Sequence, residues 1–133
     1  MSITVIDYGS GNLKSVAKAL ETAANNINSS SKIVVSSDPK VIKESDKIVL
    51  PGQGSFRDCY LGIKKISGLN ETLNEFVLEK KKPILGICVG MQLFAKTGYE
   101  SQKTEGFGWI DAEVRKINNM NKTIKLPHMG WNE

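Results

Sequence analysis

The sequence has little cysteine, histidine or aromatic character, and it has no long apolar run. Two cysteines and one histidine occur in 133 residues, and aromatic residues make up 7% of the chain. Two cysteines in a reducing compartment are expected to be free rather than bridged. No apolar stretch approaches the roughly 18 residues that cross a membrane, and the first residues lack the basic and apolar segments of a secretory signal. We therefore expect one cytoplasmic domain with free thiols.

The excess of positive charge is modest. The chain carries a formal net charge of +4, with 18 Lys and Arg against 14 Asp and Glu. Proteins that bind single-stranded nucleic acid combine basic grooves with stacking aromatic side chains, whereas aromatic residues are not interleaved with the basic ones here. We interpret the charge as a solvated surface and expect no nucleic-acid partner. Such a surface also suits an acidic protein or a phosphorylated metabolite.

The first half of the chain alternates between strand-like and helix-like patterns. Runs rich in β-branched residues predict strands at 3–6, 32–36 and 47–50. Apolar residues at helical spacing predict a helix over 13–24, and Asp38 before Pro39 predicts the start of a second helix that ends near residue 44. The order strand, helix, strand, helix, strand favours a parallel sheet with right-handed crossovers.

The second half is less regular. Apolar residues at helical spacing predict core-facing helices over 56–63 and 69–77. A polar region is expected from 97 to 103, a strand over 111–117, and a hairpin turn at 118–121 with a returning strand over 122–126.

The Gly9-Ser10-Gly11 loop invites comparison with a dinucleotide site. Such sites need a third glycine three residues further on, and that position is occupied by Lys14. A dinucleotide cofactor is therefore not expected.

The densest chemical signal is the run Gly86-Ile87-Cys88-Val89-Gly90. The apolar segment 83–87 predicts a buried central strand before the cysteine, and apolar residues at helical spacing from 91 to 95 predict a helix after it. A Gly-x-Cys-x-Gly sequence at a turn from strand to helix is the thiol counterpart of the Gly-x-Ser-x-Gly nucleophile elbow.

Cys88 is the predicted nucleophile. The tight turn pushes its sulfur out at the carboxyl edge of the sheet, and the N-terminus of the next helix favours a thiolate. The amide of Val89 can donate to a developing oxyanion. The alternative is that Cys88 is a small buried hydrophobe. The other cysteine, Cys59, lacks flanking glycines and is interpreted as structural.

A second glycine-rich loop, Pro51-Gly52-Gln53-Gly54, follows the third predicted strand. It could be a plain turn into a helix. It could also be an oxyanion loop, with the backbone amides of Gly52 and Gln53 directed at a developing negative charge. In a parallel sheet this loop and the elbow would lie at the same carboxyl edge, where open α/β folds place their sites.

The run 85–92, Leu-Gly-Ile-Cys-Val-Gly-Met-Gln, resembles the nucleophile motif of class I (triad-type) glutamine amidotransferases. The resemblance implies that Cys88 attacks the side-chain amide of glutamine, forms a glutamyl thioester and releases ammonia, while Gln92 helps hold the substrate. The Pro-Gly-x-Gly loop resembles the oxyanion strand of the family. The resemblance further implies an α/β, flavodoxin-like three-layer fold with a mostly parallel central sheet, and neither a metal nor an organic cofactor.

Two further motifs resemble one branch of this family, the glutaminase subunit of imidazole glycerol phosphate synthase. They are 7–12, Asp-Tyr-Gly-Ser-Gly-Asn, and 127–132, Pro-His-Met-Gly-Trp-Asn. The resemblance implies a heterodimer with a (β/α)8-barrel cyclase that uses ammonia to make imidazole glycerol phosphate and an aminoimidazole carboxamide ribotide in histidine biosynthesis. The residues expected at that interface are Tyr8, Asn12, His128, Trp131 and Asn132.

His128 is not expected to be the catalytic base. The family carries its base and carboxylate as His-x-Glu late in the domain, whereas the residue at that spacing here is Gly130. The resemblance therefore implies that residues 1–133 are the first two-thirds of a C-terminally truncated amidotransferase domain, inactive alone. Two hypotheses stay open: part of a glutaminase, or a non-catalytic form that only docks on the cyclase. The elbow and the glycine-rich loop favour the glutaminase, because docking needs neither.

Overall fold

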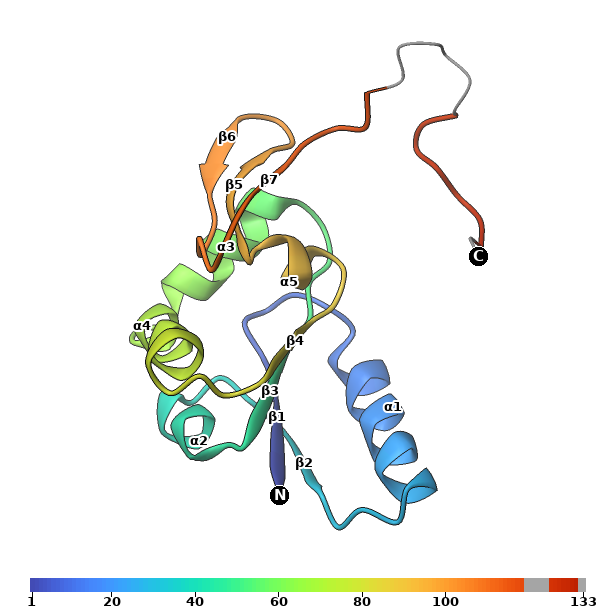
Figure 1. The fold of residues 1–133 in the computed structure, drawn as a ribbon, viewed down its shortest axis with the longest axis vertical. Coiled ribbons are helices and arrows are strands. Elements are labelled where there is room, and N and C mark those ends of the chain that lie inside the picture. Colours follow the sequence, from blue (N-terminus) through green and yellow to red (C-terminus); the bar gives the residue numbers. More distant parts are fainter. Residues whose placement is uncertain (119–124, 132–133) are drawn as a thin grey trace.

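A parallel four-stranded sheet with helices on both faces makes up the larger part of the molecule (Figure 1). The structure is a computed structural model and describes residues 1–118 and 125–131. The elements of this part are β1 (Ser2–Ile6), α1 (Leu13–Asn26), β2 (Lys32–Ser36), α2 (Pro39–Glu44), β3 (Lys47–Leu50), α3 (Phe56–Lys65), α4 (Leu69–Asn74), the π-helical segment η1 (Glu75–Glu79) and β4 (Ile84–Gly86). The strand order is β2-β1-β3-β4, with each neighbouring pair parallel. The predicted fold class, α/β with a mostly parallel central sheet, is confirmed.

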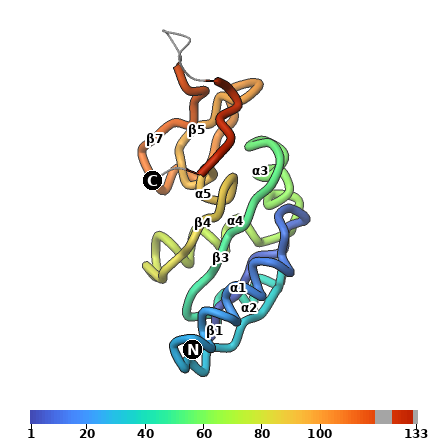
Figure 2. Tube along the Cα trace, turned by 90° about the vertical axis from the view of Figure 1, so that its right-hand side faces the viewer, coloured from blue at the N-terminus to red at the C-terminus, as the bar shows by residue number. Residues whose placement is uncertain are grey.

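A smaller sheet follows the elbow. After α5 (Val89–Gln92), the strands β5 (Ala95–Tyr99), β6 (Lys103–Glu105) and β7 (Ile110–Val114) form a sheet in the order β6-β5-β7. β5 pairs antiparallel with β6 and parallel with β7. Figure 2 shows this sheet at the end of the molecule opposite the N-terminus, beyond the carboxyl ends of the parallel strands. The small sheet therefore faces the edge at which the elbow lies.

The main core lies between the parallel sheet and the helices α2, α3 and α4. Side chains from alternate positions of β1 and β3 meet apolar side chains of these helices, and α1 lies on the opposite face of the sheet (Figure 1). Fully burying one such aliphatic or aromatic side chain contributes about 1.5–3 kcal/mol. The largest fully buried members are Ile6, Ile42, Ile48, Leu50, Phe56, Ile63, Leu69, Leu73, Phe76 and Leu93.

Side-chain caps fix where three helices begin. Asn12 Oδ1 accepts from the Ser15 amide at the start of α1, and Ser55 Oγ accepts from the Asp58 amide at the start of α3. Asp38 Oδ1 accepts from the Lys40 amide at 2.8 Å, which confirms the predicted cap before Pro39. Each such cap is worth about 1 kcal/mol.

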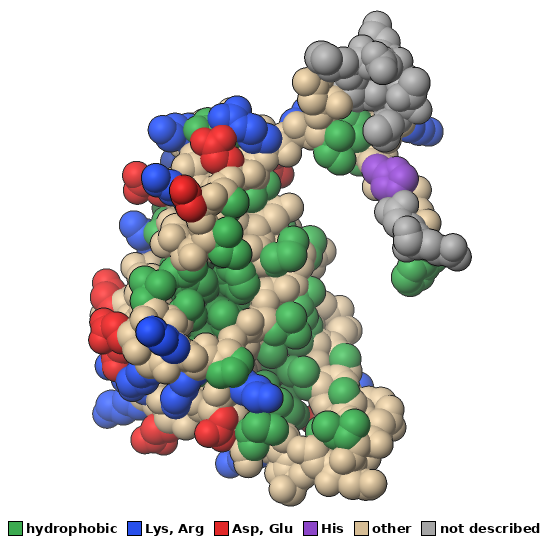
Figure 3. All heavy atoms as spheres, in the orientation of Figure 1, with side chains coloured by type: hydrophobic (Ala, Val, Ile, Leu, Met, Phe, Trp, Pro, Cys, Tyr) green, Lys and Arg blue, Asp and Glu red, His purple; other side chains and the backbone are tan. Residues whose placement is uncertain are grey.

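The strand predicted before Cys88 is confirmed as β4, but the prediction that it is buried and central is wrong. β4 covers only Ile84–Gly86 and, among the described residues, pairs only with β3. Leu85 is 53% exposed, because the chain leaves β4 through the elbow and the following strands build the second sheet rather than extending the first. Figure 3 shows apolar side chains exposed over the middle of the molecule, where Figure 1 places β4 and α5.

The helix predicted after Cys88 is also shorter than expected. α5 ends at Gln92, and the segment from Ala95, including part of the expected polar region, is the strand β5. A short apolar run fits a helix or a strand equally well, and here pairing with β6 and β7 decides. The predicted strand over 111–117 is confirmed as β7, which ends at Val114. The predicted hairpin beyond it falls largely on residues outside the described part of the chain.

Candidate active site

Cys88 lies on a strained turn between β4 and α5. Its backbone has φ 54° and ψ −120°, a conformation that residues with a side chain rarely adopt, and its thiol-bearing side chain is exposed. Such strain costs of order 1–3 kcal/mol and persists only where the surroundings enforce it. The strained turn that the Gly-x-Cys-x-Gly pattern predicts is therefore present.

The flanking glycines allow a very close approach of backbones. A Cβ on Gly90 would overlap the carbonyl oxygen of Leu50, and a Cβ on Gly86 would lie 2.5 Å from the Cα of Met91. The Ile87 amide donates to the same Leu50 carbonyl at 3.0 Å. The elbow is thus packed directly onto the end of β3.

The glycine-rich loop after β3 lies against the elbow. A Cβ on Gly52 would lie 2.5 Å from the Gly90 nitrogen and 3.0 Å from the Val89 carbonyl carbon. β3 and β4 are neighbouring parallel strands, so both loops leave the sheet at its carboxyl edge, as the sequence predicts. The structure therefore brings Gly52, Val89 and Cys88 together.

The amide of Gln53 is engaged elsewhere. It donates to Ser10 Oγ at 2.9 Å, and the Ser10 hydroxyl donates to the Gln53 carbonyl at 2.7 Å. One serine side chain therefore holds Gln53 through both of its backbone polar groups. The Val89 amide, in contrast, donates to no acceptor within residues 1–118 and 125–131. In this conformation Val89 is the better placed of the two as an oxyanion donor.

Gln92 lines a cavity of about 250 Å³ beside the elbow. The Gln92 amide donates to the Cys88 carbonyl at 3.2 Å, so the two residues lie one turn apart. Cys88 itself does not line this cavity. The residues that line it are Phe56, Gln92, Tyr99, Glu100, Val114, Arg115 and Lys116.

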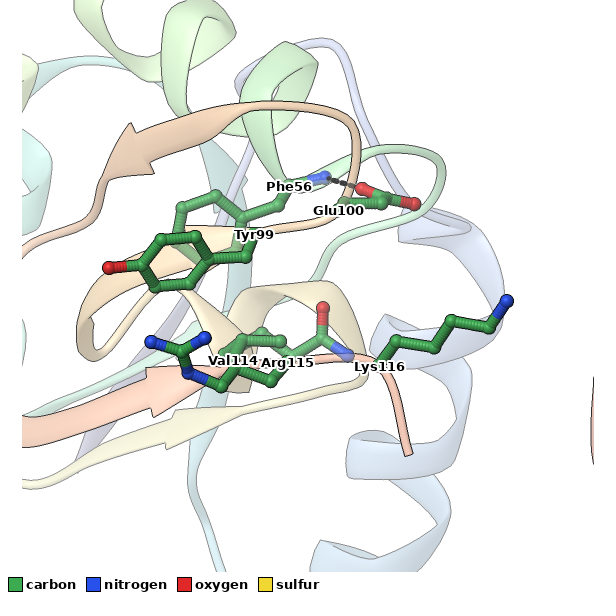
Figure 4. Close-up of a pocket in the computed structure, with 7 residues that line it drawn as sticks. Phe56, Tyr99, Glu100, Val114, Arg115 and Lys116 are labelled. Atoms are coloured by element: carbon green, nitrogen blue, oxygen red, sulfur yellow. Dashed lines mark hydrogen bonds between the residues drawn. The ribbon is translucent and has the colours of Figure 1, made fainter. Parts of the chain in front are cut away.

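The cavity carries charges of both signs. Glu100 Oε2 accepts from the Phe56 amide at 2.8 Å, and the guanidinium of Arg115 lies 4.2 Å from the centre of the Tyr99 ring. Arg115 Nε also donates to Glu113 at 2.7 Å and lowers the pKa of that carboxyl. In Figure 4 the Lys116 side chain extends away from the other labelled residues.

Sequence reasoning missed Glu100 and Arg115. They follow two strands, β5 and β7, that are brought together by pairing between distant segments, and no local pattern marks that pairing. The one sequence feature that could have indicated them is that each is a charged residue directly after a strand.

The residues expected at a partner interface fall into three groups. Tyr8 is buried, with 5% of its surface exposed, and its hydroxyl donates to the Pro51 carbonyl at 2.5 Å. Asn12 is exposed and caps α1, and His128 and Trp131 are exposed beyond the small sheet. Asn132 lies outside the described residues. The interface role of all five stays a prediction.

Clusters of metal-ligating side chains and membrane-spanning helices are both absent from the part of the chain that the structure describes. No group of three or more His, Cys, Asp or Glu side chains there could hold a metal ion. No helix there is long and apolar enough to span a membrane.

Known proteins resemble the chain over its whole length. Residues 4–133 match the family model for glutamine amidotransferase class-I. The chain is 53% identical to imidazole glycerol phosphate synthase subunit HisH of Pelagibacter ubique, over 100% of this chain and 62% of that protein. The same subunit is 49% identical in Bradyrhizobium diazoefficiens and 47% identical in Rhodospirillum rubrum, over 99% of this chain and 61% and 62% of those proteins. The chain thus spans about 62% of the length of these curated relatives, and it belongs to the class-I glutamine amidotransferase family.

Proposed function

We propose that this chain carries the nucleophile of a glutaminase, and that Cys88 attacks the side-chain amide of glutamine. The observation that carries the proposal is the exposed thiol on a strained elbow, with the glycine-rich loop packed against it. A structural cysteine needs neither the strain nor the two glycines. Family membership supports the same chemistry.

The reaction proceeds in two steps. The sulfur of Cys88 forms a bond to the amide carbon, and the carbonyl oxygen becomes an oxyanion that the Val89 amide is placed to stabilise. Collapse of this intermediate breaks the carbon–nitrogen bond, releases ammonia with a proton from a general acid, and leaves a glutamyl thioester. Water then attacks the thioester, which yields glutamate and restores the thiol. An oxyanion donor typically contributes a factor of about 10²–10³ in rate.

The charges of the cavity suit a free amino acid. Glutamine carries an α-ammonium and an α-carboxylate, and the cavity offers the Glu100 carboxylate and the Arg115 guanidinium. Gln92 lies between this cavity and the elbow and can accept or donate a hydrogen bond to the substrate. These side chains would hold the amino-acid end of glutamine while its side-chain amide reaches Cys88.

The ammonia is proposed to pass to a cyclase subunit. The relatives are named as subunits of imidazole glycerol phosphate synthase, which supports a partner subunit. The partner is proposed to be a (β/α)8-barrel cyclase that forms a heterodimer with this chain, in the cytoplasm and in histidine biosynthesis. The exposed positions of Asn12, His128 and Trp131 are compatible with contacts to that partner.

The 133 residues alone are proposed not to turn over glutamine. Their one histidine, His128, is followed at the spacing of the family's His-x-Glu by Gly130 rather than glutamate. A general acid and base are required for both steps. A form that docks on the cyclase without catalysis is the second candidate, and it would bind the cyclase equally well when Cys88 is alanine.

Cys88→Ala tests the proposal in the protein produced at its full natural length with its cyclase partner. We expect glutamine turnover to fall by about 10⁴-fold or more, because the nucleophile is removed, while binding to the cyclase is kept. Unchanged turnover in this variant would show that Cys88 is not the nucleophile.

A further inference from the structure

Tyr8 is a buried phenol directly beneath the glycine-rich loop. It stands two residues after β1, belongs to the core cluster, and donates its hydroxyl hydrogen bond to the Pro51 carbonyl at 2.5 Å. The same hydroxyl oxygen would lie 2.9 Å from a Cβ placed on Gly52. Tyr8 therefore touches the residues that bring the loop against the elbow.

The fold leaves a fitted space for this ring. Gly62 lies in the second half of α3, and a Cβ there would lie 3.1 Å from the Tyr8 carbonyl oxygen and 3.3 Å from its ring. Glycine in the middle of a helix lowers helix stability. The close approach of Tyr8 explains why glycine is present at this point of α3. The space around Tyr8 is therefore shaped both by Gly62 and by the glycine-rich loop.

The hydrogen bond fixes the direction of one peptide group. In a trans peptide the C=O and the following N–H point in opposite directions. Because the Tyr8 hydroxyl holds the Pro51 carbonyl, it also fixes the direction of the Gly52 amide, whose residue packs on Val89 and Gly90 of the elbow. The loop cannot rotate here without breaking a buried hydrogen bond.

The Tyr8 hydroxyl stays a donor. Burial, followed by the neighbouring Cys59 thiol, raises the pKa of Tyr8 well above its ordinary value. The phenol is therefore protonated across the pH range in which a cysteine enzyme works.

From this geometry we propose that Tyr8 is a positioning residue for the chemistry at Cys88, acting through the Pro51–Gly52 peptide to hold the oxyanion loop against the elbow. The inference rests on the proposed glutaminase function. It gives Tyr8 a role inside the domain, in addition to its expected place near the partner. It also predicts that the hydroxyl matters for forming the oxyanion and not for the reactivity of the thiol as such.

Tyr8→Phe in the full-length protein with its partner tests the proposal with two rates. The first is kcat for glutamine hydrolysis, which needs the oxyanion. The second is alkylation of Cys88 by iodoacetamide, in which the sulfur displaces iodide and no oxyanion forms. We expect kcat to fall about tenfold or more, with KM and the alkylation rate within about twofold of the parent.

The matched control is Tyr60→Phe. Tyr60 is a half-buried tyrosine on α3 that packs edge-on against Phe107, and its substitution should leave both rates unchanged. Equal losses of kcat and alkylation rate in Tyr8→Phe would overturn the proposal, because the hydroxyl would then only support the fold. No loss in either rate would overturn it as well.

Gly62→Ala keeps the proposal testable if Tyr8→Phe does not fold. Its added methyl displaces the Tyr8 ring while the hydroxyl is retained, so kcat should again fall with the alkylation rate kept. Parallel changes of the two rates in Gly62→Ala would contradict the role of Tyr8. Retained glutamine turnover in Cys88→Ala marks the separate case in which the proposed function itself is wrong and the role of Tyr8 falls with it.

Discussion

Single residues decide how the candidate site is arranged. Cys88 is held at a positive φ, Gly90 closes onto the Leu50 carbonyl, and Ser10 holds both backbone polar groups of Gln53. Each of these features depends on one small side chain or on its absence. The predictions at this scale therefore concern substitutions of single side chains.

Ser10→Ala should speed up thioester formation. The Gln53 amide is bound to Ser10 Oγ and can serve an oxyanion only when that bond is broken. One such hydrogen bond is worth about 1 kcal/mol, so the acylation rate measured by rapid quench with glutamine should rise about fivefold. Ser67→Ala, at an exposed position, is the control. A slower acylation in Ser10→Ala would show that Ser10 supports the productive loop instead.

Gly90→Ala should destabilise the fold strongly. Its Cβ would overlap the Leu50 carbonyl oxygen, so β3 and the elbow must separate, and overpacking of this kind costs about 1–3 kcal/mol. Urea titration measures the change. Gly108→Ala is the comparison, because its φ is 68° and nothing lies within 4 Å of its added Cβ, which leaves only a strain of about 1–2 kcal/mol. A smaller loss in Gly90→Ala than in Gly108→Ala would contradict the close packing of the elbow.

At the scale of elements, some helices and strands could be predicted from local sequence patterns, whereas others depend on pairing between distant strands. β2, β3 and α2 follow directly from β-branched runs and from the Asp38-Pro39 start, and the structure places them at the predicted residues. β5 did not follow, because Phe94 and Ala95 continue a helical spacing and only pairing with β6 and β7 makes the segment a strand. The cavity beside Gln92 depends on the same pairing, so its residues Glu100 and Arg115 carried no local signal.

Asp46 links the start of β3 to the start of β1 through hydrogen bonds to Ser2. This link makes the stability of the fold depend on pH. Its carboxylate accepts from the Ser2 amide at 2.7 Å and from the Ser2 hydroxyl, and the amide is the main cause that lowers the pKa of Asp46 below 3.8. A carboxyl group whose pKa is lowered in the folded state stabilises the fold at pH values above its unfolded-state pKa. This stabilisation is lost as the pH falls through its folded-state pKa.

Asp46→Asn should therefore be less stable than the parent at neutral pH, and the difference should shrink as the pH falls through the lowered pKa of Asp46. Urea midpoints measured from pH 7 down to pH 2 give the comparison. Asp111→Asn, an exposed site whose contact to Lys96 is 4.0 Å long, should show no such convergence. A difference between parent and Asp46→Asn that is as large at pH 2 as at pH 7 would contradict the assignment.

The molecule as a whole combines a sheet edge, at which the proposed chemistry lies, with an exposed apolar surface. The elbow and the glycine-rich loop lie between the parallel sheet and the small sheet (Figures 1 and 2). The cavity is lined by residues on or next to α3, α5, β5 and β7. Leu85, Ile87 and Met91 on and after β4 remain exposed, and an open strand edge with apolar neighbours favours association. The described residues thus hold the proposed nucleophile and its proposed oxyanion donors, while the relatives of the same family are longer than this chain.

The most direct test of the account is to find where an electrophilic analogue of glutamine bonds to the protein. A diazo ketone that replaces the glutamine side-chain amide is attacked by the nucleophile that attacks glutamine, and peptide mass spectrometry then locates the label. Cys59, buried and hydrogen-bonded to the Gln53 carbonyl, serves as an internal control in the same molecule. We predict that the label is carried by Cys88, that excess glutamine prevents it, and that Cys59 stays unlabelled. Labelling of Cys59, or labelling of Cys88 that glutamine does not prevent, would contradict the assignment of Cys88 as the glutamine nucleophile.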